Sequence, residues 1–251
     1  MLKTLFTGHH WIRLQDTTST NTYALNLLGE NPLEGTLITA EFQSMGRGQK
    51  GNTWAAPPET NLLLSLIYYP RFVELSKLFV LSKAICLGVQ DSIKFFLPAA
   101  NVQIKWPNDL LIDKKKVAGI LIENQLEGST LKACVVGIGL NVNQQNFAPE
   151  LENSATSIRR HSDDSLNRED VLQRMLENIE ARYLQLKNGQ QAQIDRDYYD
   201  NLYGYQEEIH LADEEGAFEG MIVGVNPQGK LAVQRDEKLR YYDFKEVRFL
   251  L

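Results

Sequence analysis

A chain of 251 residues is long enough for one large domain, or for one domain followed by a small module. Its hydrophobic fraction of 43% supplies a core, and its mean hydropathy of -0.31 argues against collagen-like, disordered and membrane-embedded classes. A net charge of -6 makes a poor surface for duplex nucleic acid. We therefore expect neither nucleic acid nor membrane as a partner.

The termini and the cysteines indicate a cytoplasmic protein. The N-terminal segment lacks the long apolar stretch of a signal peptide, and the longest apolar run, NLLLSLIYY, is too short to span a bilayer. Cys86 and Cys134 each lie among apolar residues and form no C-x-x-C pair. We predict buried thiols in a reducing compartment rather than a zinc or redox site.

The first part of the chain mixes helix and strand patterns. A short helix is expected at 22–28, after a polar cluster. Residues 35–43 and 61–70 read as strands, and the second is apolar at nearly every position, which predicts burial on both faces. Between 74 and 97 apolar residues recur at helical spacing until Pro98 ends the pattern.

The middle of the chain reads as a series of strands. Residues 102–106 form one strand, and 110–112 and 117–125 form a hairpin joined by DKKK. Residues 131–142 read as another buried strand. A polar loop is expected over 144–168, in which the segment ATSI could pack against the core.

Two helices and a small β module complete the pattern. An amphipathic helix begins near Asn167 and a shorter one is expected at 190–203. The rest alternates in short units, with Pro227 and Gly229 suited to a type I turn. Strict strand–helix alternation is absent, so we predict an α+β fold in which helices pack on a mixed or antiparallel sheet. The expected division is a catalytic domain at 1–204 and a β module at 205–251.

The stretch GRGQKG at 46–51 fits the pattern G-x-G-x-x-G that can wrap a dinucleotide pyrophosphate. A dinucleotide site needs a helix directly after the glycines, but Pro57 and Pro58 prevent one, and Arg71 stands where an acidic residue is expected. A phosphate-binding P-loop is excluded because no Lys-Ser or Lys-Thr pair follows. Arg47 and Lys50 could still meet an anion there, whereas the alternative is a flexible hairpin tip with two solvated cations.

Four other segments carry polar chemistry, and each also has an ordinary structural interpretation. TTSTNTYA could be a plain helix N-cap, and KWPNDLLI an ordinary Pro-Asn-Asp turn. KKKVAGILIE could be a solvated hairpin tip before a buried strand. GIGLNVN places Asn141 and Asn143 on one face of an otherwise apolar strand, so their amides need partners or a ligand.

Together the motifs STN, GRGQKGNTW, KWPND, KVAGILIE and GIGLNVN resemble the biotin protein ligases, in that family's order and at about its spacing. The resemblance covers nearly the whole chain. It implies a class II synthetase-like mixed sheet with a small C-terminal SH3-like β-barrel. It also implies synthesis of biotinyl-5′-AMP from biotin and ATP with Mg²⁺, and transfer of biotin to a lysine of a biotin carboxyl carrier domain. Family members pair through the central sheet, which makes a homodimer possible.

The resemblance also gives each matching position a role. The catalytic residues would be Arg47, Lys105, Asp109 and Lys116. The biotin contacts would be Ser19, Thr20, Asn21, Gln43, Arg47, Gly48, Gln49, Lys116 and Gly119. The ATP and adenylate contacts would be Arg47, Lys50, Trp54, Asn108 and Asn141, and no metal ligand is identified.

Two departures from the family pattern stand out. Some members carry a winged-helix DNA-binding domain before the ligase core, but STN begins at Ser19, so we expect the short form without repressor activity. Gln49 is neutral where many members have an arginine.

Two other functions remain as alternatives. One is a lipoate or octanoyl ligase or transferase on a related fold, and the other is a non-catalytic biotin or nucleotide sensor.

The mechanism expected from these residues is electrostatic. Biotin carboxylate must attack the α-phosphorus of ATP although both are anionic, so fixed cations at Arg47, Lys105 and Lys116 would lower the repulsion. No Ser-His-Asp or Cys-His arrangement is evident, and the four histidines show no metal-ligand spacing. Asp109 would orient or deprotonate the incoming lysine.

Overall fold

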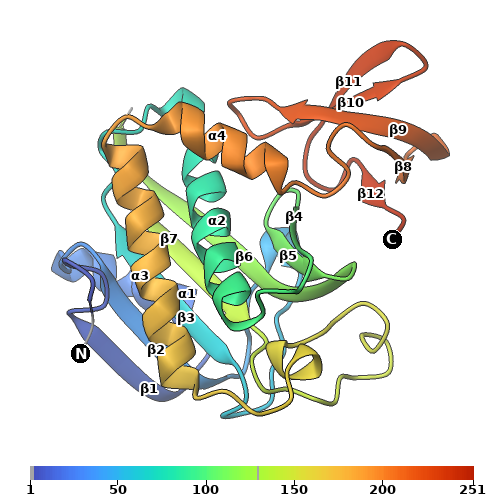
Figure 1. The fold of residues 1–251 in the computed structure, drawn as a ribbon. Helices are drawn as coiled ribbons and strands as arrows, with labels where there is room; N and C mark the ends of the chain where they lie inside the picture. The colour runs from blue at the N-terminus through green and yellow to red at the C-terminus, as the bar shows by residue number, and fades with distance from the viewer. Residues whose placement is uncertain (1–2, 129) are drawn as a thin grey trace.

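The computed structural model describes residues 3–128 and 130–251 and consists of two sheets with helices packed on the larger one (Figure 1). The larger sheet has seven strands in the order β1-β2-β3-β7-β6-β5-β4. Its strands are β1 (Trp11–Thr17), β2 (Thr36–Gln43), β3 (Leu62–Tyr68), β4 (Val102–Lys105), β5 (Asp109–Ile112), β6 (Lys115–Glu127) and β7 (Thr130–Leu140). All neighbours pair antiparallel except β1 and β2, which are parallel, so the predicted mixed sheet is confirmed.

Helices pack on both faces of the large sheet. They are α1 (Thr20–Leu27), α2 (Phe79–Phe96), α3 (Arg168–Lys187) and α4 (Gln191–Asp200), with short 3-10 turns at Leu28–Glu30, Gln49–Gly51, Leu75–Lys77 and Ile158–His161. Helices α2 and α3 cover one face of the sheet (Figure 1). Leu64 and Leu66 of β3 and Val136 of β7 point into this core, whereas Ser65 and Gly137 alternate to the opposite face.

The opposite face is only partly covered by a helix. Helix α1 packs through Ala24 against Ile38, Ile67 and Val135, which form a small second cluster at one side of the sheet. The segment 155–158 is buried, as the sequence suggested. Beyond α1, the face over β4 to β7 is left for the glycine loop and the C-terminal segment, and this is where the site lies.

The C-terminal sheet has five strands in the order β11-β10-β9-β8-β12, and all its pairs are antiparallel. Its strands are β8 (Glu208–Asp213), β9 (Gly216–Val225), β10 (Leu231–Arg235), β11 (Lys238–Tyr242) and β12 (Arg248–Phe249). The expected turn at Pro227 is present, because Gly229 N donates to Asn226 O at 2.9 Å. The small β module is thus confirmed, and the proposed division at 205 falls between α4 and β8.

Hydrogen bonds join the two sheets into one structure. Trp106 Nε1 donates to Gly229 O at 2.9 Å. The Tyr199 hydroxyl of α4 donates to Val225 O at 3.1 Å and accepts from Val225 N at 3.2 Å. Tyr203 N donates to Ile104 O at 2.8 Å. The module is therefore fixed against β4 and α4, beside the site.

One strand was not expected from the sequence. β1 (WIRLQDT) lies at the edge of the sheet and is only partly buried. Ile12 and Leu14 pack against the second cluster while Arg13 and Gln15 are exposed, but this alternation is too short to identify a strand from the sequence.

The described helices do not meet the requirements for a membrane span. None of them combines the length and apolar composition needed to cross a membrane.

Candidate functional site

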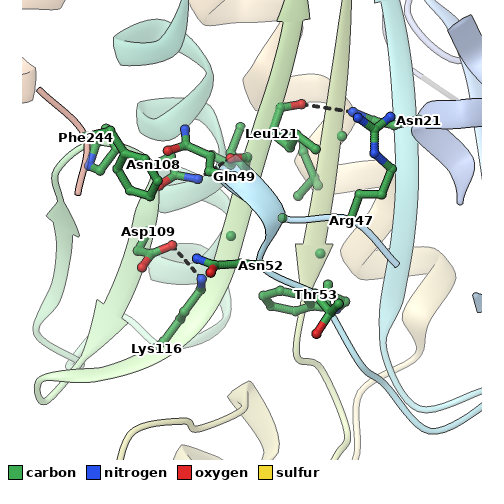
Figure 2. A pocket seen from close by; sticks show the side chains of 18 of the residues that line it. Asn21, Arg47, Gln49, Asn52, Thr53, Asn108, Asp109, Lys116, Leu121 and Phe244 are labelled. Atoms are coloured by element: carbon green, nitrogen blue, oxygen red, sulfur yellow. Dashed lines mark hydrogen bonds and ion pairs between the residues drawn. The ribbon is translucent and has the colours of Figure 1, made fainter. Parts of the chain in front are cut away.

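A cavity of about 330 Å³ lies on the open face of the large sheet, between the glycine loop and the C-terminal segment (Figure 2). Residues from α1, β2, the loop, the β4–β5 turn, β6 and β7 line it. The sequence-predicted residues that the structure brings together here are Ser19, Thr20, Asn21, Gln43, Arg47, Gly48, Gln49, Trp54, Lys105, Asn108, Asp109, Lys116 and Gly119.

One side of the cavity is a buried polar cluster at the start of α1. Thr20 donates to Gln43 Oε1 through its backbone N at 2.7 Å and its hydroxyl at 3.1 Å. Asn21 donates to Glu123 Oε2 at 2.9 Å and to Leu121 O at 3.3 Å, and its Oδ1 lies 2.6 Å from Ser65 Oγ. The first turn of the helix is therefore held by side chains of three strands, and its polar atoms face the cavity (Figure 2).

Glycines on β6 and β7 make room for these side chains. A Cβ at Gly137 would overlap the Asn21 amide, and one at Gly139 would overlap the Trp54 ring. Gly119 lies under both Trp54 and Lys116, with a Cβ there 3.1 Å from each. Three glycines on the same strand face thus form the floor of the cavity.

The glycine loop folds back on itself as a small hairpin beside this floor. Arg47 bridges Thr53, Gly48 N donates to Asn52 O at 2.7 Å, and Trp54 N donates to Gly46 O at 2.9 Å. The chain then continues without an α-helix, which agrees with rejecting the dinucleotide interpretation. The side chain of Lys50 lies outside the described part of the loop, so its expected contact with the adenylate stays a prediction.

The Arg47 guanidinium points across the cavity to β6. Its two terminal nitrogens contact the Glu123 oxygens at 3.1 and 2.8 Å, a bidentate pair. Glu123 also accepts from Asn21, so a single carboxylate connects the loop to the polar cluster. This connection sets where the guanidinium can meet an anionic ligand.

Asp109 organises the two lysines on the other side of the cavity. It lies 2.6 Å from Lys116 Nζ and 3.7 Å from Lys105 Nζ, and its side chain is only 17% exposed. Lys105 and Asp109 are cross-strand partners on β4 and β5, and Asp109 is paired with Gly119 on β6. The sheet register therefore places both amines beside one carboxylate, and Figure 2 shows the pair of Asp109 and Lys116. Asn108 next to it donates to Ile120 O, which fixes the turn.

The Trp54 ring lies on the glycine floor, with Lys116 Nζ 5.4 Å from its centre. Its indole Nε1 is buried and finds no acceptor among the described residues. A buried N–H without a partner is rare in folded proteins. In a cavity wall it supplies a donor for a bound molecule.

Asn141 does not belong to this group. It lies outside the cavity, donates to Thr156 O at 2.9 Å and accepts from Asn61 at 3.2 Å. The amide of Asn143 is likewise paired with backbone atoms of Leu166. These asparagines hold the segment after β7 in place, so the geometry does not support the expected contact between Asn141 and the adenylate.

Some residues of the cavity and of the polar cluster beside it were missed from the sequence. Ser65 and Glu123 complete the polar cluster behind the cavity lining. Ser65 is a lone serine in the apolar strand β3, whereas Glu123 stands where β6 changes from apolar to polar residues. The C-terminal module contributes Phe244, Lys245, Val247, Arg248 and Phe249. No motif marks that segment, because its placement depends on how the two sheets pack.

The two cysteines take no part in the site as nucleophiles. Both are free and fully buried. Burial raises the pKa of the Cys86 thiol far above its usual range, with a smaller contribution from Asp109, and burial raises the pKa of Cys134 to about 12. Among the described residues no cluster of His, Cys, Asp and Glu is arranged to hold a metal ion.

Comparison with known proteins agrees with this geometry. The model of the Biotin/lipoate A/B protein ligase family matches residues 11–141. The bifunctional ligase/repressor BirA of Bacillus spizizenii is 33% identical over 243 residues, which cover 95% of this chain and 74% of that protein. The biotin--[acetyl-CoA-carboxylase] ligase of Mycobacterium tuberculosis is 33% identical over 198 residues, with 76% and 71% covered.

A solved structure extends the similarity to the whole fold. The biotin protein ligase from Aquifex aeolicus, in complex with biotin and ATP, superposes with a TM-score of 0.79 at 27% identity and covers 96% of this chain and 99% of its own. Both sheets are therefore within the matched region. The chain belongs to the biotin/lipoate A/B protein ligase family.

Proposed function

We propose that the protein activates biotin with ATP to biotinyl-5′-AMP and then transfers biotin to a lysine of a biotin carboxyl carrier domain. The observation that carries this proposal is the single cavity in which a buried polar cluster, Arg47, and the Lys105–Asp109–Lys116 group converge. The relative named biotin--[acetyl-CoA-carboxylase] ligase and the Aquifex structure with biotin and ATP support this proposal.

The polar cluster suits the cyclic urea of biotin. That ring offers two N–H donors and one carbonyl acceptor, and the cavity wall offers the Thr20 hydroxyl and the Asn21 amide, which Ser65 holds from behind the lining. An apolar dithiolane ring, as in lipoate, could share none of these hydrogen bonds and would only displace the water that can solvate them. The cluster therefore favours biotin over lipoate.

The cations serve the first reaction. The biotin carboxylate oxygen forms a bond to the α-phosphorus, and the bond to the β-phosphate oxygen breaks, so that pyrophosphate leaves with the electron pair. Arg47 is paired with Glu123 and Lys116 with Asp109. Both cations would also donate hydrogen bonds to the reacting carboxyl and phosphate oxygens. Mg²⁺ would enter as part of the MgATP substrate and shield the leaving phosphates.

The second reaction needs a neutral amine at the carbonyl of biotin. Asp109 is the carboxylate that could accept a proton from the carrier lysine, because it lines the cavity and its partners are themselves site lysines. The Trp54 ring and the glycine loop would cover the mixed anhydride and keep water from it. The carrier domain, a homodimer through the central sheet, and a cytoplasmic location remain parts of this proposal.

One assay tests the function. Purified protein with biotin and MgATP should release pyrophosphate and then label a biotin carboxyl carrier domain on its lysine. Release with lipoate but not biotin would favour a lipoate ligase. Tight biotin binding without any pyrophosphate release would favour a sensor.

A further inference from the structure

The side chain of Lys116 reaches the cavity because β6 is irregular at this point. Lys116 and Gly119 both line the cavity, although residues three apart in a regular strand point to opposite faces. The pairing of β6 with β5 shifts here, and Val117 and Ala118 both lie in the core. A bulge of this kind changes the direction of a side chain, and here it turns Lys116 toward the cavity.

A segment far along the chain holds this irregular backbone. β7 ends at Leu140, before it reaches the level of Lys116. The segment 154–156 takes the place of β7 as the neighbour of Lys116. Lys116 N donates to Ser154 O at 2.8 Å, and Lys116 O accepts from Thr156 N at 2.9 Å. Both polar backbone atoms of Lys116 are therefore bonded to this segment.

A buried network of amide side chains holds the segment in turn. Asn141 Nδ2 donates to Thr156 O at 2.9 Å, and Asn141 Oδ1 accepts from Asn61 Nδ2 at 3.2 Å. Asn61 also donates to Gln144 Oε1 at 2.6 Å. Asn61, Asn141 and Thr156 are only 2–5% exposed. A buried polar network whose groups are paired is rigid, so this network fixes Thr156 and, with it, the backbone of Lys116.

We propose that Asn141, supported by Asn61, is a positioning residue for Lys116. Neither of the two asparagines lines the cavity, so each acts on the reaction through the backbone of Thr156. The Lys116 amine needs this control because it must lie beside Asp109, at 2.6 Å, and also meet the reacting carboxyl and phosphate oxygens. The inference rests on the proposed ligase function, and it gives Asn141 a role other than contact with the adenylate.

Two measurements on Asn141→Ala test this role. Hydrogen exchange of the Lys116 backbone N–H, followed by NMR, should become about tenfold faster, because its acceptor on Ser154 is held less firmly. This measurement does not depend on enzymatic activity. The kcat for pyrophosphate release from biotin and MgATP should fall about tenfold or more, whereas the KM for biotin should change less than twofold.

A double-mutant cycle shows whether the loss of rate passes through Lys116. Lys116→Met keeps most of the side-chain length and removes the charge, so adding Asn141→Ala to it should change the remaining rate less than twofold. A residue that binds ATP directly would lower both rates by the same factor. Asn61→Ala removes only the support of Asn141, so it should show the same pattern with a smaller loss. The comparison therefore does not depend on one variant being folded.

Asn143→Ala is the matched control. Its amide bonds to Leu166 N and O at 3.0 and 2.8 Å, after the same strand, but that partner does not belong to the segment 154–156. This variant should lower the melting temperature as Asn141→Ala does, yet leave the exchange of the Lys116 N–H and the kcat within twofold of wild type.

The possible outcomes are distinct. An unchanged exchange rate or an unchanged kcat in Asn141→Ala overturns the inference. Equal losses of rate in the wild-type and Lys116→Met backgrounds overturn it as well, and so do equal losses in Asn141→Ala and Asn143→Ala. Faster exchange at Lys116 in Asn141→Ala, together with no pyrophosphate release by the wild-type protein, would instead reject the ligase function alone.

Discussion

Three glycines shape this site as much as its charged groups do. Gly119, Gly137 and Gly139 lie on one face of the two central strands and leave the space that Asn21, Trp54 and Lys116 occupy. In the stretch GIGLNVN the asparagines were the expected ligand contacts, but their amides bond to the backbone of neighbouring segments. The glycines of that stretch open the cavity.

Replacing Gly137 by alanine should therefore impair biotin binding. The new Cβ would overlap the Asn21 amide, which cannot move freely because Ser65, Leu121 and Glu123 hold it. We expect the dissociation constant for biotin to rise about tenfold or more, measured by calorimetry, with a smaller loss of stability. Gly29→Ala is the control, because nothing lies within 4 Å of the added atom. Equal biotin affinity in both variants would contradict the packing argument.

The role of Asp109 can be tested separately in adenylate formation and in biotin transfer. Asp109→Asn keeps the shape but removes the proton acceptor beside Lys116. Transfer from preformed biotinyl-5′-AMP should slow by roughly 10²-fold or more, within the usual contribution of a general base. Asp113→Asn makes the same change in the β5–β6 turn, at a 68% exposed side chain, and should have no effect. A wild-type transfer rate in Asp109→Asn would exclude the proton-acceptor role.

The motifs at strand ends and turns supply residues that line the cavity, whereas their roles toward biotin and ATP stay predictions. STN, the glycine loop and KWPND all reach the cavity, because the ends of β2, β4 and β5 and the start of α1 meet there. Ser65 and Glu123 were missed because the strand pattern does not show which residues they meet. Both reach Asn21 only because β3 and β6 pair with β7 in register.

At the level of elements, the helices were the easiest part to predict and the edge strand was the hardest. Long apolar stripes identified α2 and α3, and Asn167 caps α3 by accepting from Glu169 N at 2.8 Å. The stripe is informative because each helix buries one whole face against the sheet. No residue of β1 is fully buried, and its apolar and polar residues alternate only over residues 12–15, which is too short a pattern to identify a strand.

The glycine loop is the element expected to respond to substrates. Arg47 is 44% exposed, and three glycines in six residues favour mobility. Tryptic cleavage after Arg47 should slow severalfold when biotin and MgATP are both added, because closure over the adenylate would protect the loop. Cleavage after Arg71, in an exposed turn outside the cavity, should not change. Equal slowing of cleavage at both positions, or no slowing at Arg47, would argue against a local closure.

Helix α3 also anchors the N-terminal segment through a buried carboxylate. Glu180 is 3% exposed and accepts from the backbone N of Leu5, Phe6 and Thr7 at 2.5, 3.0 and 2.8 Å. Glu180→Gln turns one acceptor into a donor, and we expect it to lower the free energy of unfolding in urea by about 1–3 kcal/mol. Glu150→Gln, in an exposed loop, should change it by less than about 0.5 kcal/mol. Equal stability of both variants would mean that water can replace these bonds.

The whole molecule shows what the sequence could not predict. Two sheets were expected, and two are present, but their relative placement depends on a few contacts between distant segments, such as Trp106 with Gly229. Only this packing turns the segment 244–249 into a wall of the cavity. The site is thus completed by a module whose own sequence carries no recognisable motif for the chemistry.

Weakening this packing should affect ATP more than biotin. Tyr199→Phe removes the hydroxyl that joins α4 to both the N and the O of Val225, which should lower the free energy of unfolding by about 1–2 kcal/mol. Because the biotin side is built on the large sheet alone, its affinity for biotin should stay within twofold of wild type. The KM for ATP should rise severalfold, since the C-terminal wall of the cavity beside Lys105 loses its fixed position. Tyr241→Phe, at a 51% exposed ring of the same module, is the matched control. Parallel losses of biotin and ATP affinity in Tyr199→Phe would contradict the expectation that biotin binding is independent of this packing.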